Sequence, residues 1–251
     1  MIHTDRSTLR AMLAGAMGLA ALLASCSTSS SGASAHNPAA YVEGQAYDPS
    51  FDPANFSDPQ PNPWFPLEPG TTWIFEGGDE HVEVTVTDQT RVIDGITAIV
   101  VTDQVFRNGE LVEDTVDWYG IDNSGNVWYL GERTAEYENG QVTTTAGSWE
   151  TGVDGAQPGI IMLADPQPDD QYRQEYLAGE AEDLAKVIGM GEAITVPAGS
   201  YDNLLRTEEW TPLDQGVVEH KWYAQGVGFV HEETMSGGIG GLDLVEIRTA
   251  P

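Results

Sequence analysis

The chain has 251 residues, which is enough for one or two small domains with a hydrophobic core. It carries 40 Asp and Glu against 10 Lys and Arg, a formal net charge of −30 at pH 7. Proteins bind nucleic acid by placing Lys and Arg against its phosphates, so this composition excludes a nucleic-acid partner. The acidic residues are scattered, which is typical of a solvated surface, and a surface that attracts cations is the alternative.

A short apolar run opens the chain. Arg6 and Arg10 precede residues 11–23, small residues follow, and Cys26 comes next. A run of 13 residues is too short to cross a bilayer, which takes about 20, and the whole pattern is typical of a secretory signal. It resembles the bacterial lipoprotein signal, in which a peptidase cuts before the cysteine and the sulfur carries a diacylglycerol. The resemblance implies export, removal of a signal peptide over residues 1–25 and lipidation of Cys26.

Cys26 is the only cysteine of the chain. A thiolate is the nucleophile that thioether formation needs, and a lone thiol in an oxidising compartment otherwise invites cross-linking. Each buried methylene contributes about 0.8 kcal/mol, so two or more acyl chains such as palmitate would anchor the protein stably. Ser27 is not acidic, which leaves both the cell membrane and the outer membrane open. An ordinary secretory signal with an incidental cysteine is the alternative.

Residues 26–63 are predicted to form a flexible tether and then a Pro-rich arm. The tether is rich in Ser, Ala and Gly and has no apolar periodicity. Over residues 41–63, Asp-Pro and Asn-Pro pairs disfavour helix and favour an extended chain. We expect Tyr47, Phe51 and Phe56 to fix this arm to the domain, and a disordered arm is the alternative.

The sequence predicts an internal repeat within a folded domain over residues 64–251. Val116-Asp117-Trp118-Tyr119 recurs as His220-Lys221-Trp222-Tyr223 at an offset of 104 residues. Val92-Ile93-Asp94-Gly95 pairs with Val196-Pro197-Ala198-Gly199 at the same offset. Ordered matches at a common offset are typical of a duplication. They predict repeat units of about 64–134 and 164–234 with an insertion over residues 135–163.

Both units are predicted to consist of strands. Residues 81–87 alternate between polar and β-branched residues, and Asp94-Gly95 and Asn108-Gly109 are typical hairpin turns. Residues 179–188 are the most helix-like stretch, but they share the register of the 81–87 strand and are therefore predicted as strand. We expect an all-β domain in which two tandem antiparallel β repeats form a sandwich or an incomplete barrel.

The insertion contains its own hairpin signal. Glu138-Asn139-Gly140-Gln141 predicts a two-residue turn, and Trp149 and an apolar run over residues 160–163 follow it. The insertion is either the place where a specific feature is added to the scaffold or a plain crossover between the two units.

The sequence predicts no enzymatic activity and no cofactor. Nucleophile, phosphate-loop and dinucleotide motifs are absent. Adjacent carboxylates such as Glu208-Glu209 and Glu232-Glu233 point to opposite faces of a strand, so they cannot form an acid and base pair with each other. A glycosidase would therefore need carboxylate pairs across strands.

No metal site is predicted either. His220 and His231 would bind a metal only if their strands were adjacent, and a histidine in a sheet surface is the favoured alternative. Residues 122–126 resemble the start of a calcium loop, but Val127 and Arg133 stand where that pattern requires Gly and Glu. We therefore expect a hairpin turn there.

Aromatic residues are the best candidates for a ligand site. Indole and phenol rings combine a large apolar area with one polar group, which suits an amphipathic ligand, and an ordinary sandwich core is the alternative. The candidates are Trp118, Tyr119, Trp149, His220, Trp222 and Tyr223.

Residues 222–230, Trp-Tyr-Ala-Gln-Gly-Val-Gly-Phe-Val, resemble a Trp-Tyr-Ala-x-Gly-Val-Gly-x-Val signature of uncharacterised secreted bacterial lipoproteins. With Pro66-Leu67-Glu68-Pro69-Gly70-Thr71-Thr72-Trp73, the resemblance covers about residues 64–247. It implies a strand, a tight glycine bend and a second strand, because glycine tolerates positive φ. It implies no activity, since that family has no established one.

These features together lead to two hypotheses. The first is a lipid-anchored, non-enzymatic protein of the cell envelope whose concave β-sheet binds an apolar or amphipathic small ligand. It has a broad likeness to lipoprotein carriers whose half-barrel sheets hold acyl chains, which is an analogy of fold alone. The second is an envelope interaction or structural protein without a ligand, with an acidic surface and a protein partner. Apolar surface inside a concavity would favour the first, and a tightly filled sandwich the second.

Overall fold

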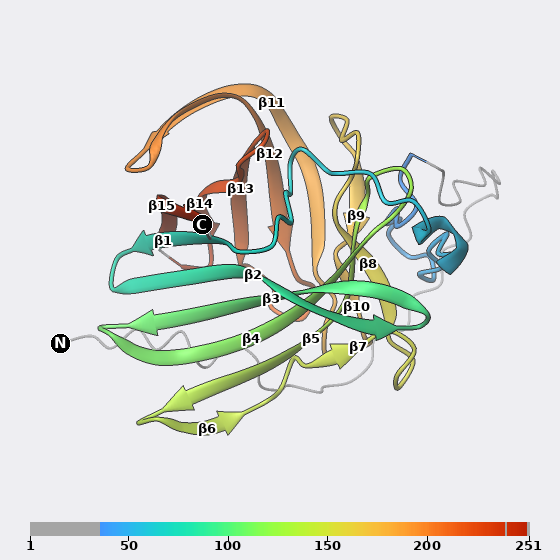
Figure 1. The fold of residues 1–251 in the computed structure, drawn as a ribbon, viewed down its shortest axis with the longest axis horizontal. Coiled ribbons are helices and arrows are strands. Elements are labelled where there is room, and N and C mark those ends of the chain that lie inside the picture. Colours follow the sequence, from blue (N-terminus) through green and yellow to red (C-terminus); the bar gives the residue numbers. More distant parts are fainter. Residues whose placement is uncertain (1–35, 239, 250–251) are drawn as a thin grey trace, which may run out of the picture.

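The fold is known from a computed structural model that describes residues 36–238 and 240–249 (Figure 1). Cys26 and the predicted signal peptide lie outside the described residues. Within the described ranges the chain forms strands and one short 3-10 helix, η1 (Pro53–Phe56), and no helix there is long and apolar enough to cross a membrane. The strands are β1 (Thr71–Gly77), β2 (Glu80–Ile93), β3 (Ile96–Arg107), β4 (Glu110–Ile121), β5 (Val127–Glu138), β6 (Gln141–Thr144), β7 (Trp149–Glu150), β8 (Gln157–Met162), β9 (Gln171–Arg173), β10 (Glu175–Tyr176), β11 (Leu184–Val196), β12 (Gly199–Trp210), β13 (Val218–Ala224), β14 (Gly228–Ser236) and β15 (Gly241–Thr249).

All strands belong to one antiparallel sheet, which confirms the predicted all-β class. The order is β10-β8-β5-β4-β3-β2-β1-β15-β14-β13-β12-β11-β9, and β6 and β7 also pair with β5. The sheet changes direction strongly along this order, so that β11 and β12 stand nearly upright in Figure 1 while β2 to β5 run across it. The structure is therefore an incomplete barrel formed by one continuous sheet.

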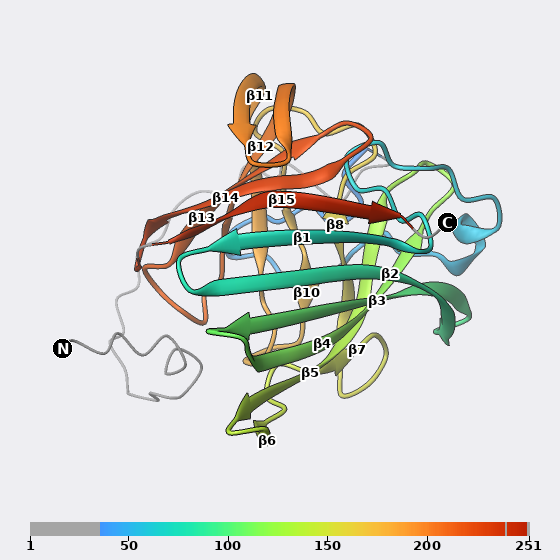
Figure 2. The ribbon, with the colours of Figure 1, turned by 60° about the vertical axis from the view of Figure 1, so that its left-hand side comes forward.

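The sheet contains two meanders of four long strands. The N-terminal meander is β2 to β5 and the C-terminal meander is β11 to β14, each formed by consecutive antiparallel neighbours. They are joined through β1 and β15, which pair with each other along most of their length (Figure 2). β15 lies beyond the second predicted repeat unit, and it links the two meanders into one sheet.

Three tight turns have the conformation that their sequences predict. Asp94-Gly95, Asn108-Gly109 and Asn139-Gly140 all have positive φ at both positions, from 46° to 82°. This is the conformation of the turn that matches the twist of the flanking strands. The hairpins predicted at these positions are confirmed, including the one inside the insertion, where it joins β5 to β6.

The predicted strand over residues 179–188 is confirmed only in its second half. β11 begins at Leu184, and the preceding residues form a turn closed by an isolated bridge between Leu177 and Ala181. The long strand predicted there extends further toward the C-terminus, to Val196.

The predicted contacts of the Pro-rich arm are confirmed. Phe51 and Phe56 pack on Trp128 of β5, with ring centroids 5.0 and 6.1 Å from it. The Tyr47 hydroxyl donates to the Pro158 carbonyl at 2.7 Å. Full burial of a side chain of this size contributes about 1.5–3 kcal/mol, and these three partly buried rings together hold the arm on the sheet.

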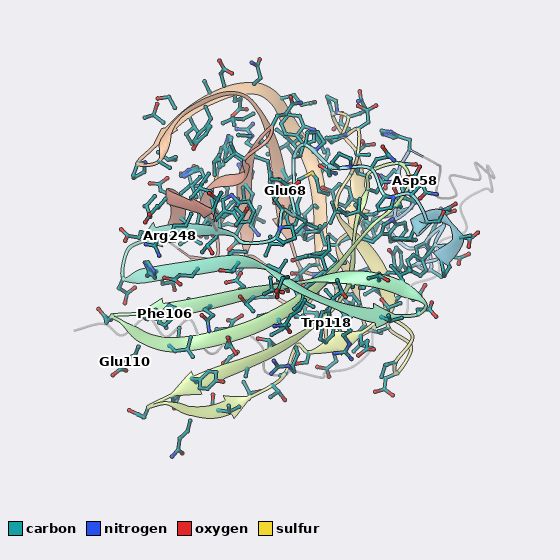
Figure 3. All side chains as sticks on the ribbon, in the orientation of Figure 1. Asp58, Glu68, Phe106, Glu110, Trp118 and Arg248 are labelled. Carbon is teal, nitrogen blue, oxygen red and sulfur yellow. The ribbon has the colours of Figure 1, made fainter. Side chains whose placement is uncertain are left out.

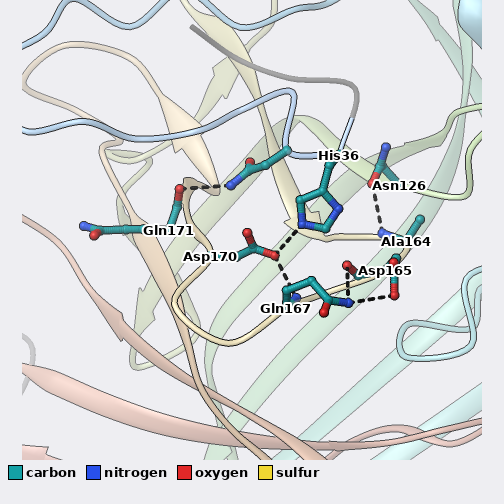
Figure 4. A network of polar contacts seen from close by, with 8 residues as sticks. His36, Asn126, Ala164, Asp165, Gln167, Asp170 and Gln171 are labelled. Atoms are coloured by element: carbon teal, nitrogen blue, oxygen red, sulfur yellow. Dashed lines mark hydrogen bonds and ion pairs between the residues drawn. The ribbon is translucent and has the colours of Figure 1, made fainter. Parts of the chain in front are cut away.

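The last residues of the predicted tether are not flexible but pack on one edge of the sheet, where Ala39 is buried. Ala40 forms a bridge with Tyr172 of β9, the last strand in the order. Beside it, His36 Nε2 lies 2.9 Å from Asp170 Oδ2, and Asn37 Nδ2 donates to the Gln171 carbonyl at 3.2 Å (Figure 4). Unpaired strand edges favour aggregation, and this segment covers part of that edge.

The turn over residues 122–126 is a hairpin turn, as predicted. The Asp122 carboxylate accepts hydrogen bonds from the Ser124 and Asn126 backbone N–H groups, from Asn126 Nδ2 and from Trp128 Nε1, at 2.8 to 3.0 Å. Both carboxylate oxygens of Asp122 therefore accept hydrogen bonds from the protein itself. No group of residues suited to a metal ion occurs in the described part of the chain.

Candidate functional site

The barrel holds a pocket of about 250 Å³ between the two meanders, and this pocket is partly open to solvent. One wall is apolar and comes from β1 and β2 on one side and from β14 and β15 on the other. Strand alternation explains this wall, because side chains two residues apart point to the same face. The residues of the apolar wall are Trp73, Phe75, Val82, Val84, Val86, Phe229 and Leu242.

The segment that joins the arm to β1 forms one side of the cavity. Its residues Phe65, Pro66 and Leu67 line the cavity, and the Phe65 ring meets that of Tyr119 edge to face at 5.3 Å. Asp58 of the arm and Glu68 of this segment are labelled in Figure 3.

Asn62 fixes the arm in this position. Its buried amide donates to the carbonyls of Gly125 and Leu163 at 2.8 and 3.0 Å. Its Oδ1 accepts from the Trp64 backbone N–H at 2.8 Å. The next residue, Pro63, accepts a backbone hydrogen bond from Gly226 at 2.7 Å, so the arm contacts the β4–β5 turn and the β13–β14 turn.

The opposite wall of the cavity is polar and strongly acidic. It contains the carboxyl groups of Asp103, Asp117, Glu209 and Glu232 and the single ammonium of Lys221, with Tyr119 and Tyr223 beside them. If all were ionised, the lining would carry four negative charges against one positive charge. Charges in a site shielded from water are stable only when they are paired or neutralised by protonation.

In the C-terminal meander the carboxylates are paired. Lys221 Nζ lies 3.0 Å from Glu209 Oε2 and 3.8 Å from Glu232 Oε2. Thr207 and Tyr223 also donate to Glu209 Oε1, at 2.8 and 3.1 Å. Burial opposes the charge of Glu209, but the Lys221 ammonium and hydrogen bonds from Thr207 and Gln174 bring its pKa below the usual value. Burial raises the pKa of Glu232 to about 7, against the pull of Lys221.

In the N-terminal meander the carboxyl groups face one another. The Tyr129 hydroxyl contacts both Asp117 Oδ1, at 2.5 Å, and Glu132 Oε2, at 3.0 Å. Burial and the neighbouring Glu132 raise the pKa of Asp117 well above its usual value. Burial and Glu113 raise the pKa of Asp103 to about 7. Asp103 Oδ1 has no contact with solvent and no hydrogen-bond partner in the described structure.

The carboxyl groups of the two meanders occupy similar positions in the register of their strands. Asp117 lies opposite Val101 on β3 and Glu132 on β5, and Lys221 lies opposite Thr207 on β12 and Glu232 on β14. The residues two positions before Asp117 and Lys221 also face acidic partners. Thr115 lies opposite Asp103 on β3, and Glu219 lies opposite Glu209 on β12. An aspartate therefore stands in the N-terminal meander where the C-terminal meander has its lysine.

Of the six residues predicted for a ligand site, Tyr119 and Tyr223 line the cavity. The other four lie outside it. Trp118 and Trp222 point to the opposite face of their strands, where Arg91 lies 4.0 Å over the Trp118 ring and Arg206 lies 5.6 Å over the Trp222 ring. Trp149 is buried beside Tyr129, and its indole N–H donates to Glu175 Oε2 at 2.8 Å.

His220 also lies outside the cavity, on the Trp222 face as strand alternation predicts. Its Nε2 is 3.3 Å from Glu208 Oε2. His231 flanks Trp222 as well and lies 2.7 Å from Asp243 Oδ1. The two histidines thus share one strand pair, and each has its own carboxylate partner, which is the arrangement of histidines in a sheet surface.

Sequence reasoning missed the acidic wall. The signal was present, because Asp117 and Lys221 both precede the tryptophan of the repeated motif and alternate with it. Asp103 follows Ile99-Val100-Val101-Thr102, a run that reads as a buried strand. A carboxylate in such a strand indicates a special environment.

Comparison with known proteins finds likeness in structure only. No protein-family model matches the chain, and no curated protein matches its sequence. A candidate lipoprotein from Parabacteroides distasonis is 14% identical, with a TM-score of 0.43 over 75% of this chain and 100% of that chain. A candidate exported protein with a YmcC-like fold from Bacteroides fragilis is 15% identical, with a TM-score of 0.44 over 74% of this chain and 99% of that chain. The function of this chain is therefore argued from its own residues.

Proposed function

We propose that this protein is exported, is held in the cell envelope by a lipid on Cys26, and binds a small apolar or amphipathic molecule without transforming it. The signal-like N-terminus and the lone cysteine support the location. The observation that carries the binding function is the cavity between the two meanders.

The pocket is a concave site of the kind that binds small molecules. It measures about 250 Å³, is partly open to solvent and is lined by apolar residues with a polar group at one end. It lies just below the roughly 300–1,000 Å³ of sites for drug-sized ligands. A filled sandwich would have favoured the interaction protein without a ligand, and an apolar cavity with a polar end favours the binding protein.

Filling the cavity tests the binding function. Val84 lies on the apolar wall, and Val84→Phe should weaken binding of n-octanol at least roughly 10-fold in isothermal titration calorimetry, because the ring occupies the space of the ligand. Val92→Phe is the matched control, since Val92 is on the same strand and 69% exposed. Octanol binding to V84F at wild-type affinity would place the ligand elsewhere. If the wild-type protein binds neither octanol nor a charged ligand with the same apolar tail, the ligand-free protein with a protein partner becomes the better explanation.

The anchor has its own test. Cys26→Ser removes the only thiol, so the protein should move from the membrane pellet to the soluble fraction of the envelope. Retention of C26S in the pellet would overturn the lipid anchor and leave the cavity argument unaffected.

A further inference from the structure

The acidic wall restricts the chemistry of the ligand that the cavity takes. Asp117 is 6% exposed and Asp103 is half-buried, and both residues line the cavity. The Oδ1 atom of Asp103 has no hydrogen-bond partner. A carboxyl group in such a place is stabilised by a hydrogen-bond donor or by a positive charge. The only basic residue among the described lining residues is Lys221, which is held by three carboxylates of its own meander, Glu209, Glu219 and Glu232.

The C-terminal meander shows what fits among these carboxylates. There an ammonium, Lys221 Nζ, lies within 3.0 to 3.9 Å of three carboxylates. At the equivalent register position of the N-terminal meander stands Asp117, and Thr115 stands where the C-terminal meander has Glu219. The same register position thus carries an ammonium in one meander and a further carboxyl group in the other.

The spacing on the N-terminal side suits a single cationic group. Asp103 lies directly opposite Thr115, so Asp117 is its diagonal neighbour on the adjacent strand. Diagonal neighbours on one face are roughly 7–8 Å apart at their Cα atoms, and their side chains converge on a smaller distance. One ammonium, with three N–H donors, can bond to both carboxylates at once.

We infer that the cavity binds a small amphipathic amine, with its ammonium between Asp103 and Asp117 and its apolar tail against β1 and β2. This inference rests on the proposed binding function and narrows it to one class of ligand. A fatty acid with an apolar tail of the same length as that of the amine is disfavoured as a ligand, because its carboxylate would contact a wall that already carries four carboxyl groups. The apolar wall and the acidic wall together therefore select the amine.

Three ligands with the same tail separate the possibilities. Isothermal titration calorimetry at about pH 8 would compare n-octylamine, n-octanol and octanoate, because only the head group changes and the amine is ionised there. We expect octylamine to bind roughly 10-fold or more tighter than octanol, since hydrogen bonds between charged groups are the strongest, and octanoate to bind weakest. Equal affinities, or a preference for octanoate, would overturn the amine and leave the binding function standing. No binding of any of the three would overturn both.

Variants then locate the ammonium. Asp103→Asn should lower the affinity for octylamine roughly 10-fold and leave that for octanol unchanged, and Asp117→Asn should do the same. Asp88→Asn, the same substitution at an exposed position of β2, should leave both affinities unchanged. Unchanged octanol binding shows that each variant is folded. If D103N and D117N both bind octylamine like the wild-type protein, the proposed position of the ammonium is wrong.

Discussion

The two meanders of the barrel bury carboxyl groups at the same register positions and compensate them in different ways. In the C-terminal meander Lys221 meets Glu209 and Glu232 across the sheet. In the N-terminal meander Asp117 stands in place of the lysine, and the Tyr129 hydroxyl bonds to it and to Glu132. The C-terminal side contains its own cation. On the N-terminal side Asp103 and Asp117 keep raised pKa values, although Lys221 also attracts Asp103, because that ammonium is held by the carboxylates of its own meander.

The difference separates a structural role from a binding role. A buried ion pair that the protein completes by itself contributes to the folded state and leaves nothing to attract a ligand. A buried carboxyl group without a counter-charge has a raised pKa and a cost in stability, and such groups concentrate at functional sites. The N-terminal meander is therefore the side of the cavity to which we assign the proposed ligand.

Loss of Lys221 should have the largest effect on stability. Lys221→Met leaves Glu209 and Glu232 buried without their ammonium, and breaking a buried pair from one side costs about 3–5 kcal/mol. Urea unfolding would measure the change. Lys186→Met removes a lysine whose partner Asp169 is 85% exposed, and it should unfold like the wild-type protein. Equal stabilities of K221M and K186M would show that Lys221 does not compensate the acidic wall.

The pH dependence of unfolding should reveal the uncompensated side. Burial raises the pKa of Asp103 and of Glu232 to about 7 and that of Asp117 upward, against unfolded values of about 4. Between about pH 4 and pH 7 the folded protein retains protons that the unfolded chain has released, so stability falls as the pH rises through that window. Calorimetric scans should show an unfolding temperature several degrees lower at about pH 8 than at about pH 5.

Asp103→Asn should reduce the slope of the unfolding temperature against pH, because the amide does not titrate. Asp103 is faced by Asp117 and Glu113 and by the Lys221 ammonium, so those groups continue to contribute to the remaining slope. Asp88→Asn should retain the full slope. An unfolding temperature that rises from about pH 5 to about pH 8 would contradict the raised pKa values.

Removal of the Asn62 side chain should have a smaller effect, shared by both meanders. Asn62→Ala leaves the carbonyls of Gly125 and Leu163 and two backbone N–H groups without their partners, and unsatisfied buried groups cost about 1–3 kcal/mol each when no water replaces the bond. Because the freed segment borders the cavity, water can enter, and we expect a net loss of about 2 kcal/mol in urea unfolding. Asn55→Ala, at an exposed position of η1, is the control. A loss no larger than that of N55A would show that the arm is held by its aromatic contacts alone.

Asp117→Asn should have the smallest effect, and it should be opposite in sign to that of K221M. The amide oxygen still accepts from Tyr129, and the substitution removes a carboxyl group that burial and Glu132 disfavour in its ionised form. At about pH 8 we expect a gain of roughly 1 kcal/mol in urea unfolding. A loss of stability would mean that the ionised Asp117 is compensated in the protein alone.

The sequence predicted the local structure of this fold well, for physical reasons. An Asn-Gly or Asp-Gly pair between two alternating strands strongly favours one turn conformation, with positive φ at both residues. The turns at residues 94, 108 and 139 could therefore be predicted from the sequence. The aromatic residues of the arm could be assigned to the sheet because an Asp-Pro-rich segment has no helix in which to bury them.

The site could be predicted only in part. Alternation places Asp117 and Tyr119 on one face of β4 and Trp118 on the other, but it does not say which face the barrel encloses. That depends on the pairing of β1 with β15, which joins residues more than 160 positions apart and curls the sheet around the cavity. The sequence therefore favours Trp118 over Asp117 as a ligand-site residue. In the structure, arginines lie over the rings of Trp118 and Trp222 on the other face of the sheet, which gives these rings a structural role.

Native mass spectrometry of the protein purified from the envelope fraction of its own host tests the central claim most directly. We expect a discrete additional mass, beyond that of the lipidated chain, which belongs to a small amine and is lost when Asp103 is changed to Asn. A spectrum with the chain mass alone, or with a bound fatty acid, would contradict the assignment of the acidic cavity as an amine site.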